Sequence, residues 1–84
     1  MSRHDRRFEE MVAEARLVLR HVSWEALTPH QTLVMRGLAE CLASEVQLAA
    51  GRALYVQYAI VRPVVRFLLH HMLRKYPKDA SLEN

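Results

Sequence analysis

The sequence predicts an all-α fold, a small bundle of three main helices. Apolar residues recur at helical spacing, whereas alternating strand patterns and the residue pairs of β-hairpin turns are absent. Glycine (2 residues) and proline (3 residues) are scarce, so few positions interrupt a helix. A chain of 84 residues suits one small domain, which we expect to span residues 1–76. Residues 77–84 would form a frayed C-terminal tail.

The first helix is expected from about Arg3 to Val22. Ser2 can cap its first turn, and Asp5 places a negative charge where the helix N-terminus favours one. One side of this segment forms a continuous apolar stripe: Phe8, Met11, Val12, Ala15, Val18, Leu19 and Val22. This pattern is typical of a helix that forms one wall of a core.

The second helix is expected to start at Pro29. Thr28 and Gln31 have the spacing of a reciprocal capping box, and proline is favoured at the first helical position. No standard capping residue occurs between Glu45 and Lys78, so the C-terminal end is harder to place. We expect the chain to fold back at Gly51, because glycine often ends helices. The alternative is one long helix that continues to Arg62.

The third helix is expected to run to about Tyr76 and to include the most apolar stretch, residues 53–76. Pro63 either kinks this helix or starts a fourth one. At about 100° per residue, one face resembles the seam between helices that pack side by side. We predict this face as a partner interface, consisting of Leu54, Tyr58, Val61, Val65, Leu68, Leu69, Met72 and Tyr76.

A basic strip lies beside that face. Arg62, Arg66 and His70 follow one another at intervals of four residues, so they share one side of a helix. An acidic surface of a partner would relieve their mutual repulsion. The acidic counterpart could also be internal, from Glu40 or Glu45.

Composition argues against several classes of function. Cys41 is the only cysteine, which excludes an internal disulfide, and no histidine or cysteine spacing matches a metal site. No glycine-rich phosphate loop or catalytic constellation is present, so we expect no catalytic residues, no cofactor and no enzymatic activity. Charged residues interrupt every long apolar run, so we expect no spanning segment and a cytoplasmic protein.

The hydrophobic fraction of 51% is high for a short chain, which buries only part of its surface. We therefore predict a small helical interaction module: a regulator, adaptor or chaperone-like factor. It would act by helix-face packing, as a homodimer or with a protein partner.

An alternative starts from the segment LTPHQTLVMRGLAE, residues 27–40, which resembles the opening of a LuxR-type helix-turn-helix. Residues 64–76 resemble the recognition helix of that family, which implies a DNA-binding transcriptional regulator. Cys41 departs from the family, because it stands where the turn glycine would be. The nucleic-acid-binding residues would be Arg62, Arg66, Arg74 and Lys75. A third alternative is a helical protein at a membrane surface.

Overall fold

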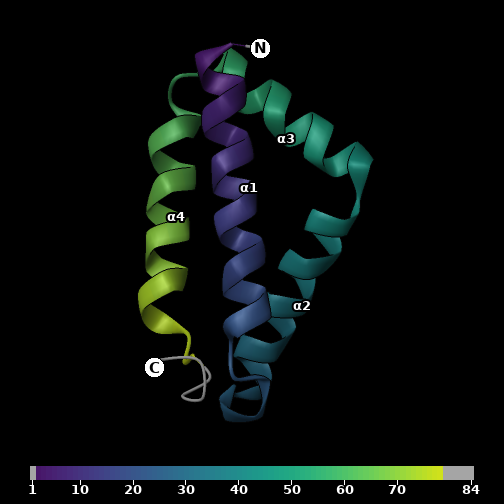
Figure 1. Ribbon diagram of the computed structural model, residues 1–84, viewed down its shortest axis with the longest axis vertical. Coiled ribbons are helices and arrows are strands. Elements are labelled where there is room, and N and C mark those ends of the chain that lie inside the picture. The colour runs from purple at the N-terminus through teal and green to yellow at the C-terminus, as the bar shows by residue number, and fades with distance from the viewer. Residues whose placement is uncertain (1, 79–84) are drawn as a thin grey trace.

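The computed structural model describes residues 2–78, and the described part of the chain is helical throughout its regular structure (Figure 1). This confirms the all-α prediction, with four α-helices rather than three. The elements are α1 (Arg3–His21), the 3₁₀-helix η1 (Trp24–Ala26), α2 (Pro29–Ala43), α3 (Glu45–Gln57) and α4 (Val61–Lys75).

Helix α1 is the centre of the bundle. It contacts α2, α3 and α4, and Figure 1 shows α4 on one side of it and the α2–α3 pair on the other. Its predicted cap is confirmed: the Asp5 N–H donates to Ser2 Oγ at 3.1 Å, and the Ser2 N–H donates to Asp5 Oδ2 at 3.2 Å. This capping box satisfies backbone donors of the first turn and fixes where the central helix begins.

The second helix begins as predicted, but the expected fold-back at Gly51 is wrong. Helix α2 ends at Ala43, and Ser44 caps α3 by accepting a hydrogen bond from the Gln47 N–H at 3.2 Å. Gly51 lies inside α3, where an added Cβ would be 3.3 Å from Phe8 Cζ. The glycine therefore permits α3 to approach α1 closely instead of ending a helix.

The apolar stretch is divided into two helices, which confirms the alternative that a fourth helix starts near Pro63. Helix α3 ends at Gln57, and α4 starts at Val61 with Pro63 in its first turn, where a missing N–H is tolerated. Arg62 fixes this corner, because its guanidinium donates to the carbonyl oxygens of Tyr55 and Val56, each at 2.9 Å. The unpaired carbonyl groups at the end of α3 are thereby satisfied.

Two apolar clusters lie at opposite ends of α1. The Tyr55 cluster consists of Phe8, Val12 and Tyr55, with the Phe8 and Tyr55 rings 5.8 Å apart. The Met35 cluster joins α1, α2 and the end of α4, and consists of Val18, Val22, Met35 and Tyr76. The side chains of Tyr55 and Met35 are 0% exposed, so each end of the bundle is closed.

The segment after α4 returns to the end of α1. The Ser23 N–H donates to the Pro77 carbonyl oxygen at 2.9 Å, and Lys78 forms a β-bridge with Val22. Pro77 of the expected tail thus accepts a hydrogen bond from the segment after α1, and Lys78 is paired with Val22. The rest of that tail, residues 79–84, lies outside the described residues.

Candidate functional site

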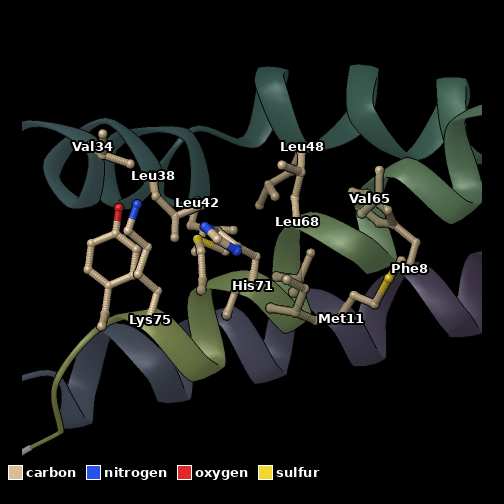
Figure 2. Close-up of a pocket in the computed structure, with 15 residues that line it drawn as sticks. Phe8, Met11, Val34, Leu38, Leu42, Leu48, Val65, Leu68, His71 and Lys75 are labelled. Carbon is tan, nitrogen blue, oxygen red and sulfur yellow. The ribbon is translucent and has the colours of Figure 1, made fainter. Parts of the chain in front are cut away.

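An apolar groove opens between the two clusters, with a volume of about 460 Å³ (Figure 2). All four α-helices contribute to it, with α2 and α3 on one side and α4 facing them. The lining residues are Phe8, Met11, Val12 and Ala15 from α1, Val34, Leu38 and Leu42 from α2, Leu48 from α3, and Val65, Leu68, Leu69, His71, Met72, Lys75 and Tyr76 from α4 and its C-cap.

The corner between α2 and α3 creates the opening. Figure 1 shows each of these helices close to α1 at its far end, whereas their junction at Ser44 stands away from α1. Arg16 bridges the gap, since its guanidinium donates to the Leu42 carbonyl oxygen at 3.3 Å. The groove lies between this corner and α4, with Leu42 and Leu48 on one side and Leu68 on the other.

The groove has two distinct ends. Figure 2 shows Val34 and Lys75 at one end and Phe8 and Val65 at the other, with the side chains along it pointing inward. The α4 wall from Val65 to Lys75 advances by ten residues, or about 15 Å at 1.5 Å per residue. The groove thus follows roughly three turns of helix.

The lining is apolar except at a few positions. His71, Lys75 and Tyr76 are its polar members, and no acidic side chain lines the groove. Lys75 lies opposite Val34, and its side chain extends toward α2 (Figure 2). A ligand would therefore contact an apolar surface along most of the groove and the Lys75 side chain at one end.

Large apolar side chains are also exposed on the helices that build the groove. Leu68 lines the groove and is 54% exposed, whereas Phe67 on α4 and Leu33 on α2 lie outside the lining and are each 70% exposed. The large apolar residues exposed in the described part of the chain are Leu17, Trp24, Leu33, Val34, Val46, Leu54, Tyr58, Ile60, Val64, Phe67 and Leu68.

The structure divides the predicted interface between two places. Val65, Leu68, Leu69, Met72 and Tyr76 line the groove. The remaining three lie outside the lining: Leu54 and Tyr58 are half-exposed at the end of α3, and Val61 is partly buried at the start of α4. The eight residues do not form one face, because the chain turns between α3 and α4.

The predicted basic strip is divided as well. Arg62 is partly buried against α3, whereas Arg66 and His70 are exposed. Arg74 follows His70 at the same spacing of four, while Lys75 lines the groove. The four residues of the nucleic-acid alternative are therefore not gathered on one exposed face of α4.

Electrostatic shifts occur at the N-terminal end of α1, outside the groove. Removal from water lowers the pKa of His4, and the charges of Arg62, Arg3, Arg66 and Arg7 lower this pKa further. The imidazole packs edge-on against the Tyr55 ring, with 6.4 Å between the ring centroids. This end of the bundle thus disfavours an additional positive charge.

At the same end of the bundle, the Asp5 carboxyl is stabilised in its charged form. Its pKa is lowered chiefly by the hydrogen bond from the Ser2 side chain and then by the one from the Ser2 backbone. Nearby, Glu9 and Arg52 form an ion pair between α1 and α3, and Arg52 lies 5.9 Å from the centroid of the Phe8 ring. The ion pair thus links α1 to α3 beside the Tyr55 cluster.

Two further properties of residues 2–78 bear on function. No group of three or more His, Cys, Asp or Glu side chains in this range is placed to hold a metal ion. None of the described helices has the length and apolar character needed to cross a membrane.

Comparison of the chain with protein-family models, curated proteins and solved structures found no match to any of them. The functional argument therefore depends on the groove. Sequence reasoning located much of the α4 wall of the groove, assigned the apolar stripe of α1 to the core, and did not identify the α2 wall. The α2 residues Val34, Leu38 and Leu42 recur every four positions, a signal that fits a core helix and a groove wall equally well.

Proposed function

We propose that this protein is a non-enzymatic interaction module that docks the apolar face of a helix in its groove. The observation that carries this proposal is the groove itself, which remains open and apolar between two closed clusters. Concave apolar sites between the helices of a bundle are common places for ligands. A regulator, adaptor or chaperone-like factor would use such a site without chemistry.

A helix fits the shape of the groove. Amphipathic helices that dock in grooves present apolar residues at positions i, i+3 or i+4, and i+7, which span about two turns. The α4 wall is about 15 Å long and accommodates such a set. Leu48 faces Leu68 across the groove, so an inserted apolar side chain would contact both walls.

The energy of docking would come from apolar area removed from water. Each Å² of buried apolar surface contributes roughly 25 cal/mol, and a few central side chains usually supply most of the binding energy. Leu68 is a good candidate for such a central role, because it lines the groove and is still half-exposed. The occupied groove would cover it from both sides.

Binding to another copy and binding to a different protein both fall within this proposal. Nucleic-acid binding has less support, because Arg62 is engaged by α3 and Lys75 lies in the groove. Protein docking instead explains why apolar residues from all four α-helices converge on one opening.

The test is an NMR titration of the isotopically labelled chain with a panel of amphipathic helical peptides. We expect amide shifts concentrated around Met11, Ala15, Leu38, Leu42 and Leu68. Shifts elsewhere, or none with any peptide, would contradict helix docking in the groove.

A matched pair of variants sharpens this titration. Leu68→Glu places a charge in the groove and should weaken peptide binding by about 30-fold or more, the scale of a central interface residue. Phe67→Glu introduces the same charge at an exposed neighbour that does not line the groove. It should leave the affinity within about threefold, because rim substitutions have small effects.

A further inference from the structure

We infer that the helix that occupies the groove is acidic, belongs to a different protein, and places a carboxylate against Lys75. This inference rests on the proposed function and adds that the partner helix is acidic and comes from a different protein. Its basis is the distribution of charge over the groove and α4.

Helix α4 has basic residues and no acidic ones. Within Val61–Lys75 it carries Arg62, Arg66, Arg74 and Lys75 together with two histidines. The groove lining has a lysine and no carboxylate, so a partner cation would find no counter-charge there. A partner carboxylate at the Val34–Lys75 end would pair with the Lys75 ammonium and avoid a charge left unpaired on docking.

A second copy of this chain complements the groove poorly. Its α4 helix presents more exposed large apolar side chains than its other helices, through Val64, Phe67 and Leu68. That helix also brings the same set of cations, so two α4 helices that met in the groove would repel each other. The formal net charge of +3 on each copy adds to this repulsion.

The geometry also predicts where along the partner helix the carboxylate lies relative to the apolar anchors. The apolar anchors would occupy the part of the groove between Phe8 and His71, and Lys75 lies one turn of α4 beyond His71. The partner should therefore carry Asp or Glu about three or four residues beyond its terminal apolar anchor.

The experiment is selection from a displayed library of helical peptides against the full chain. The peptides carry apolar residues at i, i+3, i+4 and i+7, and all other positions are randomised. We expect enriched peptides to carry Asp or Glu within one turn of a terminal anchor. Enrichment without an acidic excess would overturn this inference and leave helix docking in place, whereas enrichment of no peptide would contradict helix docking itself.

Charge reversal then tests Lys75 directly with the enriched consensus peptide. Lys75→Glu should weaken its binding by about fivefold to tenfold and should favour a matched peptide in which lysine replaces the acidic residue. Arg74→Glu makes the same change of charge at the next residue, outside the groove lining, and should weaken binding by about twofold at most. Equal effects of the two variants would contradict a specific contact with Lys75.

Sedimentation of the chain without peptide tests whether a second copy of the chain occupies the groove. We expect a monomer at the concentrations used for selection. A dimer that Leu68→Glu dissociates and Phe67→Glu does not would assign the groove to a second copy and overturn the inference of a different, acidic partner.

Discussion

The closed ends of the bundle and the groove between them differ in how far their side chains are removed from water, although the same helices build both. Around Tyr55 and Met35, the helices converge on α1 and exclude water from those side chains completely. In between, the α2–α3 corner at Ser44 stands away from α1, and Leu68 remains 54% exposed on the facing helix. Buried apolar residues of the two clusters thus form the core at each end, whereas half-exposed lining residues such as Leu68 keep apolar surface accessible between them.

This difference separates folding from binding. Side chains that are fully removed from water in the free protein contribute to its stability, whereas half-exposed ones retain apolar area that a partner can still bury. Fully buried residues should therefore be sensitive to truncation, while half-exposed groove residues such as Leu68 should tolerate substitution and lose binding.

The largest effect is expected from Tyr55→Ala. Truncating a fully buried aromatic residue costs about 3–5 kcal/mol, which is comparable with the whole stability of a small domain. Urea denaturation followed by circular dichroism should show a chain that is largely unfolded without denaturant. Tyr58→Ala is the matched control, since Tyr58 is half-exposed, and should cost about 1 kcal/mol or less. Equal costs would show that the Tyr55 cluster is not a closed core.

The next effect concerns the corner that places α4 beside the groove. Arg62→Ala removes both hydrogen bonds to the end of α3 and should lower the free energy of unfolding by about 1–3 kcal/mol. Arg66→Ala, at an exposed position one turn later, should change it by about 0.5 kcal/mol at most. Similar values from chemical denaturation would contradict a structural role for Arg62.

A smaller difference in stability is expected between alanine substitutions at the two glycines. Gly37 is exposed inside α2 with nothing within 4 Å of an added Cβ, so Gly37→Ala should raise stability by about 0.5–1 kcal/mol. In Gly51→Ala, the contact with Phe8 at 3.3 Å should cancel or reverse this gain. Thermal melts of the two variants would measure the difference, and an equal gain would contradict the close approach of α3 to α1.

The smallest effect is a dependence on pH. The pKa of His4 is lowered below its usual 6.5, so the unfolded chain binds this proton more readily than the folded chain. The contribution of His4 is complete above pH 6.5 and is lost as pH falls through 6.5 toward the lower pKa of the folded state. His4→Gln should flatten the pH dependence of the denaturation midpoint over this range.

The Asp5 carboxyl contributes in a more acidic window. Its pKa is lowered from 3.8, so its contribution is complete above that pH and is lost as pH falls through the lower value of the folded state. Because the Asp5 contribution is complete above pH 3.8, Asp5 adds nothing to the slope just below pH 6.5. An unchanged slope in His4→Gln would contradict the environment described for this residue.

Local signals allowed much of the fold to be predicted from the sequence. The capping boxes at Ser2 and Thr28 fix where α1 and α2 begin, because each depends on residues three positions apart. The corner at Ser44 was missed because an Ala-Ser-Glu segment also continues a helix, and Gly51 offered a stronger stop signal. Whether that glycine ends a helix or contacts Phe8 depends on tertiary packing, which no local pattern contains.

The candidate site was predictable only in part for the same reason. Helical spacing brought Val65, Leu68 and Met72 together correctly, since they lie on one helix. It also added Leu54 and Tyr58, which lie before the turn that precedes α4. An apolar stripe has the same sequence whether it is covered or left open, so the groove became visible only once all four α-helices were placed.

The most direct test of the account is the pairing of stability and binding in Leu68→Glu. We predict a folded chain whose free energy of unfolding stays within about 1 kcal/mol of the original, together with a loss of helical-peptide binding of about 30-fold or more. A variant that unfolds as Tyr55→Ala is expected to, or one that binds the peptide as tightly as the original chain, would contradict the division between closed core and open groove.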